Sequence, residues 1–139
     1  MTDVMMLSGL ILSGGNAAWT GRQMPAGTLG GVVTSANISC LDLSATQLVV
    51  LSACQSGKGS TTVEGLLGLQ MAFKKTGART LVMTLWDVSD MVTRRFMTTF
   101  YDNLINHRCG RREAFEKARR TIRDIYPEPL YWAGFVMVD

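Results

Sequence analysis

The fold of this chain is decided by the stretch Leu48-Val49-Val50-Leu51-Ser52-Ala53-Cys54-Gln55-Ser56-Gly57, which joins an apolar run to a thiol and then to a turn. A run of Leu and Val without polar alternation predicts a strand that is covered on both faces. The polar, glycine-rich residues 55–59 predict a loop after that strand. Cys54 is therefore expected at the carboxyl end of a central strand, where α/β proteins carry functional residues. The alternative is a small core cysteine, since free Cys is among the most buried residue types.

Strand and helix patterns alternate along the rest of the chain, which predicts an α/β fold with a mostly parallel sheet and helices on both faces. Apolar residues spaced by four mark the helices, and continuous apolar runs bounded by turn residues mark the strands. The expected elements are strands over Met5–Leu12, Gln47–Ala53, Thr80–Trp86 and Ala133–Val138, a short helix over Ser35–Leu41 capped by Thr34, and long helices over 63–75, 92–104 and 114–125.

The composition is that of one compact globular domain. Of the 139 residues, 47% are apolar and 18% are charged. A chain of this length can bury roughly two thirds of the surface that its unfolded form exposes. Three cysteines at spacings unlike those of zinc sites predict neither a disulfide framework nor a metal centre, which favours a reducing, cytoplasmic location. The apolar start over Val4–Leu7 lacks the basic flank of a signal peptide and the length of a membrane span.

Positive charge gathers in the second half of the chain. Residues 71–139 carry twelve basic and eight acidic side chains, whereas residues 1–70 carry two and three. Such a bias can indicate a nucleic-acid surface. The basic residues between 108 and 123 are, however, interleaved with acidic ones at i,i+4 spacings, a pattern typical of a solvated helix face. Nucleic-acid binding is therefore not expected.

Five blocks of the sequence carry a family resemblance. In chain order they are Leu51–Gly59, Val63–Phe73, Gly77–Arg79, Leu85–Asp90 and Tyr131–Val136. Together they resemble the CHAT domain, a caspase-like cysteine peptidase module often found with TPR repeats. The likeness begins at Leu7–Leu12 and runs to the C-terminus. It implies a partial caspase-haemoglobinase-like sandwich and an incomplete catalytic dyad.

The resemblance implies that Cys54 is the nucleophile and that its backbone N–H is one oxyanion donor. In the family, a His-Gly pair on an earlier strand supplies the general base, and it precedes the segment matched by Leu7–Leu12. Residues 1–139 are therefore expected to form a single CHAT-like domain that lacks the N-terminal strand–helix units carrying this histidine. Glu64 matches a family position beside the active-site loop, although its spacing from Thr61 suits a helix capping box equally well.

A catalytic thiol needs a base, because a cysteine with a pKa of about 8.5 is mostly protonated at neutral pH. His107 is the only histidine, and it follows Cys54 in the sequence, whereas the family's base precedes the nucleophile. We interpret His107 as a surface residue near the C-terminus of a helix.

Two acidic residues, Asp87 and Asp90, follow the second buried strand and are expected at the same sheet edge as Cys54. The family's pattern at this place is Trp, Val and Asp, matched by Trp86, Val88 and Asp90. A carboxylate there could hold the basic side chain of a substrate's P1 residue. The structural alternative is that Ser89 or Asp90 caps the following helix.

The sequence thus predicts the nucleophile-bearing C-terminal part of a caspase-like cysteine endopeptidase, which hydrolyses peptide bonds with a Cys/His dyad whose histidine is not in this chain. The alternative is a non-catalytic CHAT-like protein-interaction module. The expected partners are a protein or peptide substrate and an upstream segment or partner chain that completes the sheet and supplies the histidine. No cofactor, metal or membrane is expected, and no Gly-x-Gly-x-x-Gly fingerprint indicates a nucleotide.

Overall fold

The structure is a computed structural model that describes residue 5 and residues 8–11, 30–51 and 63–139. Its chain divides into two compact units. The first unit comprises residues 1–47 and 60–79, and the second comprises residues 48–59 and 80–139.

The first unit contains a short β-ribbon and two helices. Strand β1 (Gly9–Ile11) pairs antiparallel with β2 (Val32–Thr34). Gly9 is required at this pairing, because a Cβ there would collide with the carbonyl oxygen of Val33. Helices α2 (Ser35–Ser39) and α3 (Val63–Lys75) contact each other.

The predicted cap of α2 is confirmed. The hydroxyl of Thr34 accepts a hydrogen bond from the backbone N–H of Asn37 at 3.2 Å. The backbone N–H of Thr34 in turn donates to Asn37 Oδ1 at 3.0 Å, which completes a capping box. The strand β2 directly before this cap was not predicted, because Val32–Thr34 is too short to give a periodic pattern.

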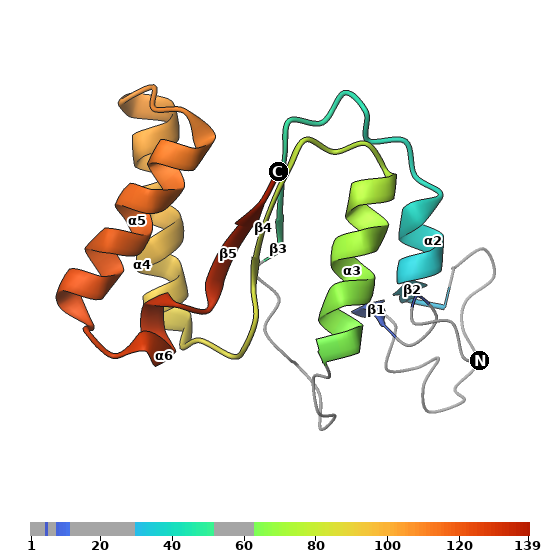
Figure 1. Cartoon of the computed structure of the whole chain (residues 1–139), viewed down its shortest axis with the longest axis horizontal. Helices are drawn as coiled ribbons and strands as arrows, with labels where there is room; N and C mark the ends of the chain where they lie inside the picture. Colours follow the sequence, from blue (N-terminus) through green and yellow to red (C-terminus); the bar gives the residue numbers. More distant parts are fainter. Residues whose placement is uncertain (1–4, 6–7, 12–29, 52–62) are drawn as a thin grey trace. The chain divides into compact units, whose positions relative to one another are not determined.

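The second unit is a three-stranded sheet with helices (Figure 1). The strand order is β3-β4-β5, with β3 parallel to β4 and β5 antiparallel to it. The elements of this unit are β3 (Leu48–Leu51), β4 (Thr80–Thr84), α4 (Asp90–Tyr101), the π-helical turn η2 (Asp102–Asn106), α5 (Arg111–Ile125), α6 (Pro129–Trp132) and β5 (Phe135–Val138). This mixed α/β architecture confirms the predicted fold class. Among the described strands, however, the sheet is mixed rather than mostly parallel, and β3 lies at its edge with four half-buried residues, so the expectation of a central strand covered on both faces is wrong.

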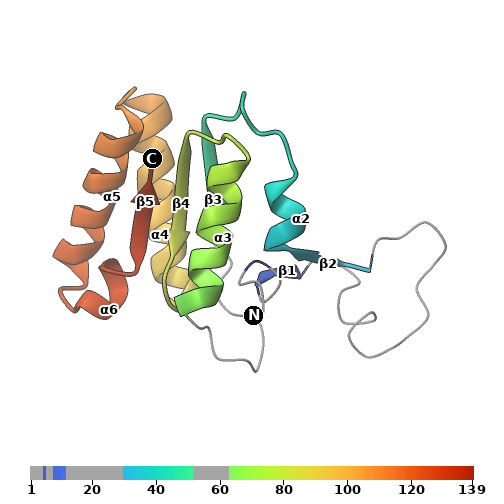
Figure 2. The ribbon, with the colours of Figure 1, turned by 45° about the vertical axis from the view of Figure 1, so that its right-hand side comes forward.

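The direction of β5 follows from the two helices before it. Helix α4 begins at the carboxyl end of β4 and leads away from it, and α5 packs beside α4 and returns (Figure 2). The chain therefore re-enters the sheet from the carboxyl edge, which makes β5 antiparallel to β4. The expectation of a parallel last strand is wrong, because it assumes one crossover helix between neighbouring strands, whereas the two helices predicted and found between β4 and β5 return the chain to the same edge.

Aromatic rings form the centre of the second unit's core. Phe96 of α4 stacks on Phe135 of β5 with ring centroids 3.9 Å apart, and Phe115 of α5 meets Phe96 edge-on at 5.6 Å. The i,i+4 stripes predicted for the two long helices are confirmed as their buried faces, except that Leu104, the last predicted member of the first stripe, lies in η2 and is half-buried. Their members are Val92, Phe96 and Phe100 on α4 and Ala114, Ala118 and Ile122 on α5, all fully buried. Among the described helices, none is both long enough and apolar enough to cross a membrane.

Candidate functional site

The parallel pairing of β3 and β4 defines one edge of the sheet in the second unit. Leu51, the last residue of β3, lies opposite Met83 near the end of β4. The carboxyl ends of β3 and β4 therefore lie at the same edge of the sheet. Cys54 follows Leu51 by three residues in the sequence and lies outside the described residues.

The segment that follows β4 is anchored by contacts with the chain before β5. The backbone N–H of Leu85 donates to the carbonyl of Gly134 at 2.8 Å. The indole Nε1 of Trp86 donates to the carbonyl of Leu130 at 2.8 Å. The Trp86 ring lies directly on Gly134, where a Cβ would be only 2.8 Å from Trp86 Cε2. Val88 is buried in the core behind this segment.

Ser89, and not Asp90, is the N-cap of α4. The Ser89 hydroxyl accepts a hydrogen bond from the backbone N–H of Val92 at 3.4 Å. Asp90 is the first residue of the helix, where a carboxylate is stabilised by the positive end of the helix dipole. Both Asp87 and Asp90 are exposed, and neither forms an ion pair or side-chain hydrogen bond with a residue that the structure describes. Neither carboxylate is therefore neutralised by a partner in the described part of the chain.

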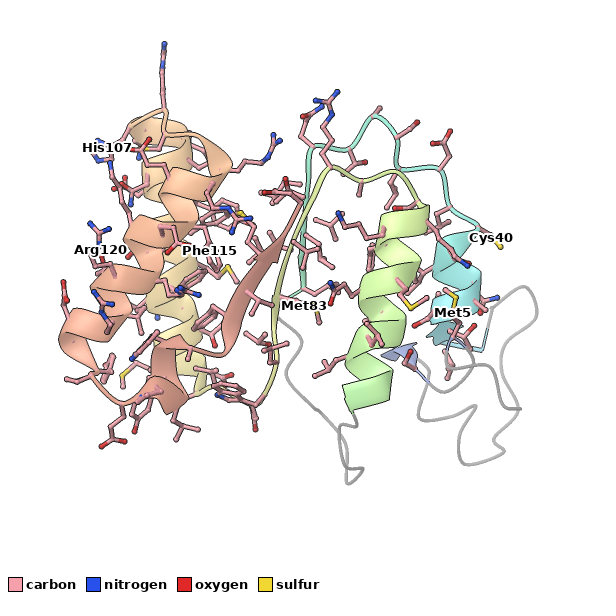
Figure 3. All side chains as sticks on the ribbon, viewed as in Figure 1. Met5, Cys40, Met83, His107, Phe115 and Arg120 are labelled. Atoms are coloured by element: carbon pink, nitrogen blue, oxygen red, sulfur yellow. The ribbon has the colours of Figure 1, made fainter. Side chains whose placement is uncertain are left out.

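His107 lies far from this edge. It ends η2, and its Nε2 is 3.4 Å from Asp102 Oδ2, with 63% of the side chain exposed. Helix α4 and η2 separate it from Asp90 by about 25 Å, at roughly 1.5 Å per residue. Figure 3 shows it at the end of these helices that is remote from the start of α4. The interpretation of His107 as a surface residue after a helix is confirmed.

The remaining sequence candidates are placed as follows. Glu64 is the second residue of α3 in the first unit, and its side chain, like Thr61, lies outside the described part, so its role stays a prediction. Cys40 is exposed, and Cys109 is half-buried with Lys117 Nζ 3.4 Å from its sulfur. Hydrogen bonds from Lys117 to Glu113 and then to Cys109 raise the pKa of the Lys117 ammonium. Within the described ranges, no three His, Cys, Asp or Glu side chains gather as metal ligands would.

One contact of this site was not predicted from the sequence. Trp86 was singled out only as a motif residue, whereas the structure bonds it to Leu130 across 44 residues. The signal in the sequence is Gly134, since a glycine beside Trp132-Ala133 and just before a buried strand indicates a close approach of another group.

Comparison with known proteins identifies the family. A family model described as "CHAT domain" matches residues 3–139. The chain belongs to the CHAT domain family. Tetratricopeptide repeat protein 28 of mouse is 32% identical over 109 residues, which cover 77% of this chain and 4% of the mouse protein. The human protein of the same name is 28% identical over 109 residues, with the same coverage. The chain thus spans only a small part of these relatives, and the predicted family is confirmed.

Proposed function

We propose that this CHAT domain carries the nucleophile and the P1 pocket of a cysteine endopeptidase. Cys54 attacks the scissile carbonyl, and Asp90, with Asp87, binds a basic P1 side chain. The observation that supports the proposal is the parallel register of β3 and β4, which puts the carboxyl ends of the strands preceding Cys54 and the two aspartates at one sheet edge.

Chain length supports the proximity of these groups. Cys54 follows Leu51 by three residues, so the covalent chain permits at most about 11 Å between their Cα atoms. Leu51 and Met83 are paired neighbours, and paired strands lie about 4.8 Å apart. Asp87 follows Met83 by four residues. Cys54 and Asp87 thus each follow neighbouring strand residues by only three or four positions.

The exposure and charge of the two aspartates suit a substrate pocket. Ser89 already caps α4, and Asp90 has no side-chain partner among the described residues, so its carboxylate can receive a ligand. A guanidinium or ammonium group at P1 would form a charge-assisted hydrogen bond with it. Such a pair discriminates between substrates better than shape alone, because a neutral P1 residue leaves the carboxylate unpaired.

The general base of this reaction is proposed to come from outside the 139 residues. His107 lies about 25 Å along the helices from Asp90, by the rise of about 1.5 Å per residue, and it is paired with Asp102. It therefore cannot take the thiol proton of Cys54 without a rearrangement of α4. A His-Gly segment on an upstream or partner polypeptide would supply both the base and the second oxyanion donor.

The decisive experiment compares the chain alone with the chain preceded by a His-Gly-bearing CHAT segment, against peptides with Arg, Lys, Leu or Glu at P1. The chain alone is expected to give no measurable turnover, since loss of a general base costs about 10²- to 10⁴-fold. The joined protein is expected to cleave after Arg and Lys, and Cys54→Ser is expected to abolish cleavage.

Asp90→Asn tests the pocket separately from the nucleophile. It is expected to lower kcat/KM for Arg relative to Leu by about tenfold, as loss of one charge-assisted contact does. Asp102→Asn is the matched control, because Asp102 is an exposed carboxylate at the other end of α4. No turnover in any arrangement would favour the non-catalytic interaction module, and turnover of the chain alone that His107→Ala abolishes would overturn the assignment of the base.

A further inference from the structure

A small basic pocket lies where α5 meets α6 in the second unit. It has a volume of about 100 Å³ and is lined by Glu116, Arg119, Arg120, Arg123 and Trp132. Arg120 projects from the outer side of α5 (Figure 3). The sequence alone predicts an ordinary solvated helix face for these arginines, because Trp132 lies beside them only in the folded chain.

Two of the arginines are held in place by aromatic rings. The guanidinium carbon of Arg119 lies 5.9 Å from the ring centroid of Trp132 and 5.7 Å from that of Phe115. The guanidinium carbon of Arg123 lies 5.7 Å from the Trp132 centroid. Trp132 is itself fixed, because its Nε1 donates to the carbonyl of Pro127 at 3.0 Å. A guanidinium that rests on a ring loses little freedom on binding and keeps N–H groups for a ligand.

The positive charge of this pocket is not neutralised by its surroundings. Among the described residues, the one carboxylate paired with these three arginines is Glu116, whose Oε2 lies 3.7 Å from Arg119 Nη2. That separation is too long for a hydrogen bond. By contrast, Arg112 at the start of α5 makes a 2.8 Å pair with Asp139. The pocket therefore holds a surplus of two positive charges and many unused donors.

We propose that this pocket binds the carboxylate side chain of an acidic peptide segment from a partner protein. A carboxylate is planar and accepts two parallel N–H bonds from a guanidinium, which matches the arginines held on Trp132. The volume admits one side chain rather than a nucleotide base. Glu116 also interrupts the run of positive charge that a phosphate backbone would have to follow. The inference is independent of Cys54 and of peptidase activity.

The test is fluorescence anisotropy with the full 139-residue chain and a labelled octapeptide of alternating Glu and Ala, at low salt. The matching Gln-Ala peptide and a single-stranded DNA oligonucleotide serve as comparison probes. The Glu-Ala peptide is expected to bind most tightly. Arg119→Gln with Arg123→Gln is expected to weaken that binding about tenfold, because it removes the two ring-held guanidinium groups that pair with the carboxylate. Glu116→Gln, which removes the internal competitor, is expected to tighten it.

The matched control is Arg94→Gln with Arg95→Gln. It removes the same charge from the exposed side of α4, and it is expected to change affinity less than about twofold, as screened surface charges do. Equal losses from the two double variants would overturn the proposal, as would tighter binding of DNA or equal binding of the Gln-Ala peptide. If removal of the stacked arginines unfolds the chain, Arg120→Gln, which has no ring contact among those described, must still weaken binding.

Discussion

Replacing Gly134 with alanine tests whether Trp86 is fixed by direct packing on the chain before β5. The added Cβ would lie 2.8 Å from Trp86 Cε2 and 3.0 Å from Trp86 Nε1. Carbon atoms repel strongly at such distances, since their optimal separation is about 3.5–4.0 Å. The indole must therefore move, and its movement stretches the 2.8 Å hydrogen bond from Nε1 to the carbonyl of Leu130.

The expected loss in the free energy of unfolding is a balance of three effects. Overpacking of a fixed site costs about 1–3 kcal/mol, and loss of the indole hydrogen bond costs about 0.5–1.5 kcal/mol. Alanine also lowers the conformational entropy of the unfolded chain, which stabilises the folded state by about 0.4–1 kcal/mol. Because Trp86 is 38% exposed, part of its ring can move into solvent, which keeps the overpacking cost near its lower limit. We expect Gly134→Ala to destabilise the protein by about 1–2 kcal/mol.

The measurement is urea denaturation at neutral pH, followed by circular dichroism and tryptophan fluorescence. Gly110→Ala is the control without a clash, because a Cβ at Gly110 meets no atom within 4 Å, and its expected cost, below about 1 kcal/mol, is that of replacing the glycine N-cap of α5. In a Trp86→Ala background, Gly134→Ala should cost less than about 0.5 kcal/mol, since the clash has been removed. An equal cost of Gly134→Ala in both backgrounds would refute the reasoning.

Two further predictions concern the hydrophobic core and the loss of stability at acid pH. Phe96→Ala should destabilise the protein by about 3–5 kcal/mol in the same assay. The reason is that Phe96 is fully buried and contacts three aromatic rings. Met91→Ala is the control and should cost little, because Met91 is 63% exposed. The pKa of the Asp139 carboxyl is lowered from its ordinary value of 3.8, chiefly by the hydrogen bond from Arg112. Its stabilising effect is therefore present above pH 3.8 and is lost as the pH falls through the lower folded pKa. Thermal melts across the acid range should show a shallower decline for Arg112→Gln, and an unchanged slope would contradict the assignment.

Local patterns were enough to predict the elements that carry the candidate site. The apolar run ending at Leu51 forms β3, and the stripe through Phe96 is the buried face of α4, so the type of both elements could be predicted without tertiary information. The cap by Ser89 is likewise local, because an N-cap and its acceptor lie three residues apart. Such features depend only on residues that are close together in the sequence.

Features that depend on distant pairs could not be predicted in this way. The direction of β5 depends on the path of two helices, and the ring of Trp132 becomes a binding feature only when α6 lies beside Arg119 and Arg123. The π-helical turn η2 has the same apolar residues as a continued α-helix, so its periodicity does not distinguish the two. Each of these outcomes is decided by packing between segments far apart in the sequence.

The anchoring of the segment after β4 bears directly on whether its aspartates can act on a substrate. An exposed carboxylate on a loose loop would lose much of its binding energy to the cost of ordering the loop. Here the loop is held at Leu85 by Gly134, and at Trp86 by Leu130. Val88 is buried, and Ser89 caps a long helix. The backbone of both aspartates is therefore positioned before any ligand arrives, so the proposed P1 contact requires only the side chains to be ordered.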